Sequence, residues 1–238
     1  MNLPKAAFFL SLRTLTYGLG FFVTALLFYL LGSQNSLVDA SPWWPVYGLF
    51  ANLICFLIID EALRKENKKP IDLIAVQPKK LKKDIMLSLP FIVLSLIIAV
   101  GTSFAFGYML YGRYPFEIMP LFSAIPIWII IGFAVIFPII NSIVEEMTYN
   151  GYIFPRIETK LKSKSSAIVL VLLFFTLQHI FITFVPDVKY MVWRLLSFIP
   201  LLLFWILIYN RMRRLTTLIV VHWFMDLFAI LSLIFTPQ

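Results

Sequence analysis

Five side chains that can carry out acid–base or metal chemistry lie inside apolar stretches of the sequence. They are Glu145, Glu146, His179, His222 and Asp226, and they include both histidines of the chain. An ionisable group in a membrane helix costs roughly 2.5–3.5 kcal/mol on insertion scales, so such groups usually face a partner or a cavity. A carboxylate in a poorly solvated cavity can act as general base and then as general acid, and a neutral histidine can position water. The residue types therefore predict hydrolysis by an activated water molecule.

The spacing of these residues predicts that they meet in one cavity, which we expect to open toward the cytoplasm. His222 and Asp226 are four residues apart, as are Glu146 and Asn150, and residues four apart share a helix face. Two histidines and a carboxylate also match a catalytic zinc site that keeps one open position. Zinc or another divalent metal held by His179, His222 and Asp226 therefore remains an alternative to metal-free chemistry.

Two other interpretations of the same residues remain open. Buried Glu–His pairs can hold helices together without any catalysis. Chains of acidic residues and histidines also serve proton and ion pathways in membrane transporters. A peptide-cleavage assay separates an enzyme from an interaction protein, and ion flux in liposomes would identify a transporter.

The composition shows what kind of structure must position these groups. Hydrophobic residues make up 61% of the 238 residues, charged residues make up 13%, and the mean hydropathy is +0.91. Soluble globular proteins have roughly 45–50% apolar and about 25% charged residues. This composition excludes a soluble enzyme, a disordered chain and a disulfide scaffold, and it predicts a polytopic membrane protein.

Stretches of about 20 apolar residues predict membrane helices, because the hydrocarbon core is about 30 Å thick and a helix rises about 1.5 Å per residue. Continuous rather than alternating hydrophobicity excludes a transmembrane β-barrel. The fold class is therefore all-α. The fourth stretch is too long for a simple span, so we expect a tilt, a break or a cytoplasmic extension there. About seven spans are predicted, at 8–32, 43–62, 85–110, 120–154, 165–186, 190–209 and 215–235.

The positive charges indicate the orientation of these spans. The N-terminal flank and the connections at 63–84, 155–164 and 210–214 together hold 17 of the 20 Lys and Arg residues. By the positive-inside rule, this side and the N-terminus are cytoplasmic. The net charge of +8 then reflects topology and lipid headgroups, so we expect no binding to nucleic acid.

Three short motifs in the C-terminal half make the sequence similar to a known family. Residues 145–151 (EEMTYNG) resemble the Glu-Glu-x-x-x-Arg motif of the CAAX-protease and bacteriocin-processing family, also called the abortive-infection family. Residues 175–179 (FTLQH) resemble its Phe-x-x-x-His motif, and residues 222–226 (HWFMD) resemble its His-x-x-x-Asn/Asp motif. The order, helical setting and spacing of the three motifs agree with that family over roughly residues 141–230.

The resemblance implies an all-helical intramembrane protease. Eukaryotic members trim the last three residues of prenylated proteins, and bacterial members are linked to peptide processing and bacteriocin self-immunity. By resemblance, Glu145 is the water-activating glutamate, His179 is its partner and Glu146 has an orienting role. By the same resemblance, His222 and Asp226 hold a metal or stabilise the oxyanion.

One position departs from the family pattern, because Asn150 stands where the family has arginine. An arginine would pair with a buried carboxylate, whereas asparagine brings no charge. An ionised Glu145 therefore needs another cation, and the sequence offers a bound metal or a protonated His179. The departure also keeps a catalytically silent member of the family as an alternative.

Together these observations predict one integral-membrane domain over residues 1–238, with the motif-bearing core at about 120–235. The expected activity is that of an intramembrane endopeptidase of the glutamate or metallo type. Its substrate would be a prenylated, lipidated or membrane-embedded hydrophobic peptide near the cytoplasmic face. The resemblance to bacterial members implies a multi-pass protein of a bacterial cytoplasmic membrane, in contact with its lipids. The alternative functions are a silent bacteriocin-immunity or membrane interaction protein and, after that, an ion-coupled transporter.

Overall fold

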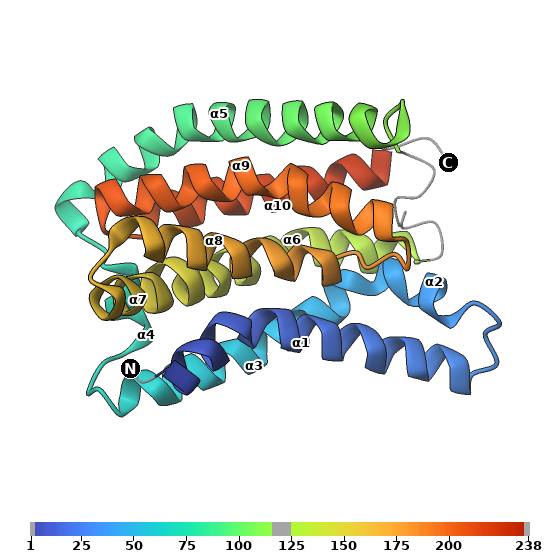
Figure 1. The fold of residues 1–238 in the computed structure, drawn as a ribbon, viewed down its shortest axis with the longest axis horizontal. Coiled ribbons are helices and arrows are strands. Elements are labelled where there is room, and N and C mark those ends of the chain that lie inside the picture. The colour runs from blue at the N-terminus through green and yellow to red at the C-terminus, as the bar shows by residue number, and fades with distance from the viewer. Residues whose placement is uncertain (1–2, 116–124, 236–238) are drawn as a thin grey trace.

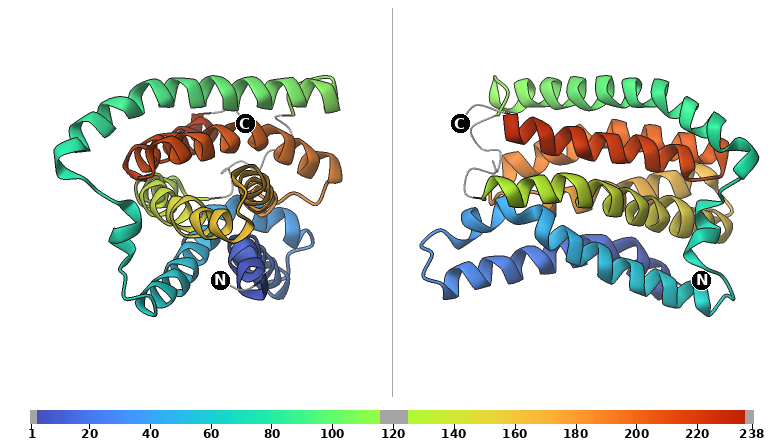
Figure 2. Two further views of the ribbon diagram at one scale, coloured as in Figure 1. Left: turned by 60° about the vertical axis from the view of Figure 1, so that its left-hand side comes forward. Right: turned by 180° about the vertical axis from the view of Figure 1, so that it is seen from behind.

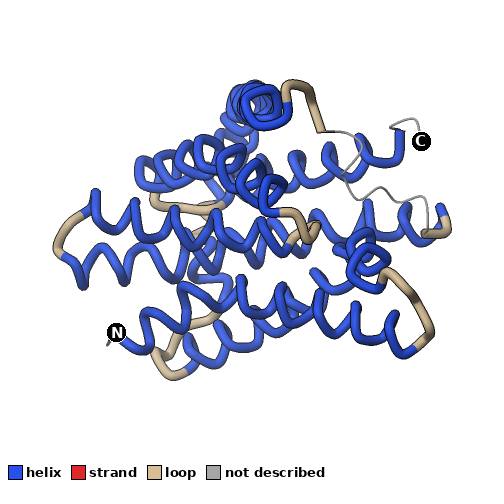
Figure 3. Tube along the Cα trace, turned by 45° about the vertical axis from the view of Figure 1, so that its right-hand side comes forward, coloured by secondary structure: helices blue, strands red, loops and turns tan. Residues whose placement is uncertain are grey.

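The computed structural model describes residues 3–115 and 125–235, and every regular element in these ranges is helical (Figure 3). A 3₁₀ turn at Ser41–Trp43 leads from α2 into α3, and a π-helical segment at Met147–Ile153 joins α6 to α7. The α-helices are α1 (Leu3–Leu30), α2 (Ser36–Ala40), α3 (Trp44–Arg64), α4 (Pro70–Ile74), α5 (Pro78–Tyr111), α6 (Ile127–Glu146), α7 (Phe154–Leu161), α8 (Lys164–Phe181), α9 (Val188–Met212) and α10 (Thr216–Phe235).

Within the described residues, the long helices pack in a closed ring. Each helix contacts the next in the order α1, α3, α6, α10, α5, α9 and α8, and α8 in turn contacts α1. Figure 1 shows α5, α9, α8 and α1 across the front of the molecule. Figure 2 shows α10 between α5 and α6 in the view from behind. A ring of this kind can enclose a cavity to which several helices contribute side chains.

Length and composition mark these helices as membrane-spanning. Six helical segments of the described chain are long and apolar enough to cross a bilayer, and Thr216–Ser232 is a shorter apolar helix. About seven spans were predicted, and this part of the expectation is confirmed. The protein is therefore an integral, multi-pass membrane protein, while its orientation stays a prediction.

The predicted boundaries need two corrections. The first helix begins at Leu3 rather than residue 8, so Arg13, which was counted as a flanking charge, lies almost three turns inside it. The fourth span begins at Ile127, and it continues through the π-helical segment into α7, which ends at Leu161. The expected break or extension of this span is thus a π-helical segment followed by a polar helix. Residues 120–124, which the predicted span and the predicted core both include, lie outside the described residues.

The connections that are rich in Lys and Arg gather at one end of the ring (Figure 1). Ion pairs join them there: Arg213 donates to both oxygens of Glu158 at 2.7 and 3.0 Å, and Arg156 pairs with Glu66. Arg214 also donates to both oxygens of Asp84, at 2.6 and 2.5 Å, which fixes the start of α5 against that of α10. We refer to this side as the basic end.

The buried apolar residues form two clusters that meet near the middle of the ring. One contains Leu12 of α1 and Cys55 of α3, and the other contains Tyr17 and Ala51 of the same helices. Arg13 and Asn52 lie between the two clusters along these helices, and both are fully buried. A polar layer therefore crosses the protein between two apolar cores.

The helices that supply this layer approach each other closely. A Cβ atom at Gly48 would lie 2.7 Å from Cε2 of Phe137 and 3.2 Å from Cε1 of Tyr17. Only glycine therefore lets α3 pack this tightly against α6 and α1. This contact brings the polar side chains of three helices within hydrogen-bonding distance of one another.

Candidate active site

Glu145 and Glu146 end α6 directly before the π-helical segment, and both side chains are fully buried. Single π-helical turns inside helices are rare and occur frequently at functional sites. The environments of the two carboxylates differ. Oε1 of Glu145 has no hydrogen-bond partner among the described residues, and Glu145 lines a cavity. Glu146 does not line the cavity, and it accepts from Nδ2 of Asn150 at 2.7 Å and contacts His222.

The cation that an ionised Glu145 needs comes from α1. Nη2 of Arg13 donates to Oε2 of Glu145 at 2.8 Å, and both side chains are buried. Arg13 lies about 15 Å along α1 from Leu3, at about 1.5 Å per residue, and so is well inside the helix. A buried charge is tolerated only when it is paired and hydrogen-bonded, and here each ion compensates the other.

Neutral groups from three other helices complete the surroundings of Arg13. Nε donates to Oε1 of Gln178 at 2.7 Å, Nη1 to Oδ1 of Asn52 at 2.7 Å, and Nη2 to Oδ1 of Asn141 at 2.9 Å. Asn141 in turn donates from Nδ2 to Oδ2 of Asp226 at 2.9 Å. The network therefore fixes the guanidinium in one orientation and links it to the α10 carboxylate.

His222 lies among three carboxylates. Its Nδ1 is 3.0 Å from Oε1 of Glu146, and its Nε2 is 3.5 Å from Oδ2 of Asp226 and 3.8 Å from Oε1 of Glu145. Carboxylates only accept hydrogen bonds, so both ring nitrogens are satisfied together only when each carries a proton. The ring also packs against Trp205, with centroids 4.5 Å apart.

His179 has a different environment. Its Nδ1 is 3.0 Å from the backbone oxygen of Phe175, and a carbonyl can only accept. Nδ1 therefore carries the proton in the neutral ring, and Nε2 is left with a lone pair. The ring stacks on Phe198 with centroids 3.9 Å apart and lines the cavity.

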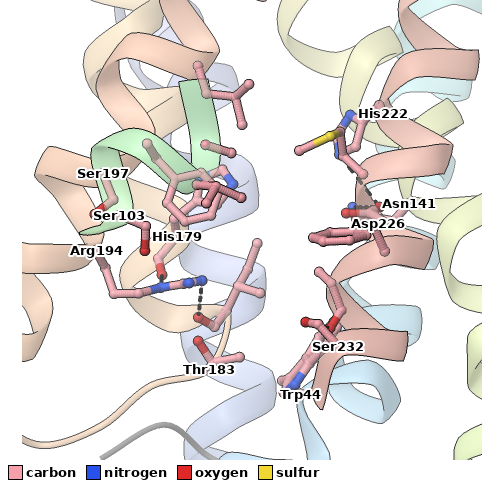
Figure 4. Close-up of a pocket in the computed structure, with 18 of the residues that line it drawn as sticks. Trp44, Ser103, Asn141, His179, Thr183, Arg194, Ser197, His222, Asp226 and Ser232 are labelled. Atoms are coloured by element: carbon pink, nitrogen blue, oxygen red, sulfur yellow. Dashed lines mark hydrogen bonds and ion pairs between the residues drawn. The ribbon is translucent and has the colours of Figure 1, made fainter. Parts of the chain in front are cut away.

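The cavity has a volume of about 250 Å³ and is lined mostly by apolar and aromatic side chains. Glu145, His179, His222 and Asp226 all contribute to its wall, as the sequence predicted. Figure 4 shows His179 on one side of it, with His222, Asn141 and Asp226 on the opposite side. The predicted convergence on one cavity is thus present in the structure.

The cavity runs toward one end of the ring. Its wall extends to Trp44 at the start of α3, Tyr190 near the start of α9 and Ser232 near the end of α10. The starts of α3 and α9 and the end of α10 lie toward the end of the ring opposite the basic end (Figure 1). At the basic end, a Cβ atom at Gly151 would lie 3.0 Å from Cδ1 of Leu215 and 3.3 Å from Cβ of Leu73. The cavity therefore extends away from the basic end, where Gly151 packs closely, and which end faces the cytoplasm stays a prediction.

The proposed metal ligands do not form a metal site as arranged here. Across residues 3–115 and 125–235, no three His, Cys, Asp or Glu side chains are placed to hold a metal ion. Asp226 accepts from Asn141, and Nδ1 of His222 is engaged by Glu146. His179 contributes only Nε2, on the opposite side of the cavity. The predicted ligands His179, His222 and Asp226 are therefore not grouped around one metal position in this arrangement, and a metal site there stays a prediction.

The sequence reasoning missed Arg13. It treated Arg13 as a charge flanking the membrane and therefore offered only a metal or a protonated His179 as the cation for Glu145. The cost of an ionisable group in a membrane helix was the signal that could have found Arg13, because this residue lies within the predicted span 8–32. Asn52 and Gln178 carried no such signal, because neutral polar residues are common in membrane helices.

Comparison with known proteins agrees with the motifs. Residues 124–228, somewhat less than half of the chain, match the family model described as type II CAAX prenyl endopeptidase Rce1-like. No curated protein and no solved structure matches the chain. The match covers α6, the π-helical segment, α7, α8 and α9 and most of α10, and therefore all three motifs. The resemblance drawn from the motifs is thereby confirmed, because residues 124–228 match the model of an Rce1-like type II CAAX prenyl endopeptidase domain.

Proposed function

We propose that the protein is an intramembrane endopeptidase in which Glu145 activates the attacking water. The observation that carries this proposal is the unequal state of the two oxygens of Glu145. Oε2 is held by Arg13, whereas Oε1 has no hydrogen-bond partner in the described chain, and Glu145 is one of the residues that line the cavity. A general base needs a free oxygen within reach of water and a charge that stays in place until the reaction, and Glu145 has both.

The reaction follows from the groups around this oxygen. Oε1 of Glu145 takes a proton from water as the water oxygen attacks the carbonyl carbon of the scissile peptide bond. Nε2–H of His222 faces the cavity and donates to the carbonyl oxygen as it becomes an oxyanion. The C–N bond then breaks, and the leaving nitrogen takes the proton held by Glu145. Nε2 of His179, a hydrogen-bond acceptor, orients the second hydrogen of the water.

The remaining polar residues act through Glu145, His179 and His222. Glu146 fixes the His222 ring through Nδ1, and Asn150 fixes Glu146. Asp226 lies 3.5 Å from Nε2 of His222 and stabilises its positive charge. Ionised Asp226 cannot donate to an oxyanion, so its role is to position and charge the histidine. Arg13 compensates the charge of Glu145 throughout.

The walls of the cavity favour a hydrophobic substrate that arrives through the bilayer. Val100 and Phe104 of α5 and Phe228 of α10 line the cavity, and 41–42% of each is exposed. These apolar, partly exposed side chains support an entry for the substrate between α5 and α10. A prenylated, lipidated or membrane-embedded peptide is the substrate class that can approach by this route. We propose a bacterial cytoplasmic membrane as its location.

Cleavage of synthetic peptides by the purified protein in nanodiscs tests this proposal. The set pairs each hydrophobic peptide with a version that carries a farnesylated cysteine, and mass spectrometry detects the products. Glu145→Gln should slow cleavage by roughly 10²–10⁴-fold, the usual contribution of a general base. Glu61→Gln makes the same chemical change at an exposed residue near the end of α3 and should leave the rate unchanged.

Two results would contradict the proposal. Equal cleavage by wild type and Glu145→Gln would remove Glu145 from the reaction. Binding of the peptides without cleavage by the wild type would instead favour the catalytically silent interaction protein.

A further inference from the structure

A group of exposed lysines surrounds α4 at the basic end of the molecule. Figure 1 shows α4 and the start of α5 at this end. Residues 68–83, which we name the lysine surface, carry six lysines, all exposed: Lys68, Lys69, Lys79, Lys80, Lys82 and Lys83. Within the described residues, none of the six has an ion pair with a carboxylate.

The two acidic residues at and beside this surface are already engaged. Oδ2 of Asp72 accepts from the backbone nitrogen of Lys69 at 2.7 Å. Asp84, the next residue after the surface, is fully buried and accepts from Arg214 with both oxygens. The positive charge of the lysines is therefore left for an anion outside the chain.

The position of the lysines along α5 places them at the depth of lipid headgroups. Lys79, Lys82 and Lys83 are three or four residues apart and share one face of α5. Four residues after Lys82, about 6 Å further along the helix, the same face presents the exposed side chain of Met86 and then that of Leu89. Because α5 is long and apolar enough to span the membrane, this exposed apolar face contacts lipid tails. The lysines stand where that face ends, which is where lipid phosphates lie.

Exposed apolar side chains accompany the lysines. Ile71 of α4, Val76 between the helices and Leu81 of α5 are 56%, 41% and 39% exposed. A soluble polyanion would leave these side chains in water. A membrane surface offers phosphates to the lysines and acyl chains to the apolar residues at the same time, so the composition favours a lipid bilayer as the partner.

The lysine surface also contacts the element that follows the two catalytic-motif glutamates. A Cβ atom at Gly151, in the π-helical segment, would lie 3.3 Å from Cβ of Leu73 in α4. The backbone oxygen of Ile74, at the end of α4, accepts from the nitrogen of Leu215 at 3.2 Å. The helix α4 has only five residues, none of them buried, so little else in the chain holds it in this place.

We propose that the lysine surface binds the phosphates of anionic phospholipids in the leaflet at the basic end, and that this contact holds α4 against the π-helical segment. A cluster of lysines beside a membrane helix attracts anionic lipids, each lysine strengthening binding by about fivefold. Lysines lie on both sides of α4 in the sequence, so bound lipids fix both of its ends. The inference does not depend on peptidase activity.

Native mass spectrometry of the purified full chain tests the binding. The protein is equilibrated with equimolar phosphatidylglycerol and phosphatidylcholine of identical acyl chains, and the ratio of the retained lipids is measured. Wild type should retain phosphatidylglycerol in at least about fivefold excess. The triple variant Lys79→Gln/Lys82→Gln/Lys83→Gln should lower this ratio by at least about fivefold, and the corresponding triple variant with arginine should keep it.

A matched variant separates this surface from the general charge of the basic end. Lys160→Gln/Lys162→Gln/Lys164→Gln removes three exposed lysines at the turn between α7 and α8, and it should leave the ratio within about twofold. Equal losses in the two glutamine triple variants would overturn the assignment, because the attraction would then follow only the number of charges. Equal retention of the two lipids by wild type would overturn it as well.

Two soluble anions distinguish a lipid from other sources of phosphate. Glycerol 1-phosphate, which carries the phosphate without acyl chains, should not displace phosphatidylglycerol. Displacement at equimolar concentration would show a site for a free phosphate ester and overturn the membrane assignment. A single-stranded oligonucleotide that binds wild type in phosphatidylcholine nanodiscs, and no longer binds the first triple variant, would identify a nucleic-acid surface and overturn it too.

Hydrogen exchange tests the second half of the proposal. In wild type, the amides of α4 and of residues 147–153 should exchange at least about threefold more slowly in phosphatidylglycerol nanodiscs than in phosphatidylcholine nanodiscs, because the bound lipid suppresses local opening. The first triple variant should show no such difference. Preferential retention of phosphatidylglycerol with unchanged exchange in residues 147–153 would overturn the claim that the lipid holds α4 against this segment.

Discussion

Two regions of the molecule supply the charges of the candidate site. The N-terminal helices α1 and α3 supply the cation, and the family-matched region 124–228 supplies the carboxylates. The matched region holds the candidate reactive groups: Glu145, Glu146, His179, His222 and Asp226. The N-terminal region has no recognised motif, yet it supplies Arg13, whose guanidinium contacts Glu145 at 2.8 Å. The matched region has Asn150 where a family arginine stands, and that asparagine reaches Glu146 rather than Glu145.

This difference shows that a motif can lose a charged member while the chain retains a cation at the site. A buried carboxylate requires a compensating charge, and the requirement does not specify which helix supplies it. Here the cation lies on a helix far away in sequence but adjacent in space to α8 and α3. The absence of arginine at position 150 is therefore poor evidence for a silent protein.

The largest expected effect comes from separating the two regions at their ion pair. Arg13→Gln leaves Glu145 buried without its partner, and breaking a buried pair in this way costs about 3–5 kcal/mol. We expect a loss of that size in the free energy of unfolding, measured by denaturant titration in mixed micelles, together with loss of peptidase activity. The double variant Arg13→Gln/Glu145→Gln should recover most of the stability and none of the activity.

A matched control removes an arginine from a solvent-exposed pair. Arg64 pairs with Asp60 at 2.8 Å, but its side chain is 72% exposed. Arg64→Gln should change the free energy of unfolding by less than about 1 kcal/mol, because exposed pairs contribute little. A double variant as unstable as Arg13→Gln would show that Arg13 supports the fold through its neutral partners rather than through Glu145.

A smaller effect is expected when the family arginine is restored. Asn150 donates to Oε2 of Glu146 at 2.7 Å, so an arginine at this position would pair with Glu146. Asn150→Arg should therefore change kcat by less than about tenfold and should not rescue Arg13→Gln, since the two positions serve different carboxylates. Peptide cleavage by the single and double variants measures this. Recovery of activity in Arg13→Gln/Asn150→Arg would show that either helix can supply the cation for Glu145.

The same comparison explains how far the sequence could predict the molecule. The spans, the all-α class and the meeting of Glu145, His179, His222 and Asp226 followed from hydropathy and helix spacing. Arg13 was counted with the cytoplasmic flank although the predicted span 8–32 contains it, because a basic side chain near the end of a membrane helix usually reaches the interface. In the structure the helix extends to Leu3 and places this charge in the interior.

The direction of the cavity could not be derived in the same way. It depends on which ends of the ring are filled by packing, such as Gly151 against Leu215 and Leu73. Such contacts join helices that are distant in sequence, and hydropathy and local spacing do not describe them. Charge counts in the loops predict which end faces the cytoplasm, but they carry no information about where the interior is hollow.

The smallest expected effect is that of chelation. Arg13 already compensates the charge of Glu145, and the candidate ligands are engaged by hydrogen bonds: Asp226 with Asn141 and His222 with Glu146. Exhaustive treatment of active protein with a zinc chelator should therefore leave kcat within about twofold, with no stoichiometric metal in elemental analysis. Loss of activity that zinc restores would require His222 and Asp226 to exchange these partners for a metal.

The variant Asp226→Asn distinguishes the metal-free route from the metal-dependent route further. Without a metal, asparagine can still accept from His222 and activity should fall only moderately, whereas a metal site would lose an anionic ligand and much of its affinity.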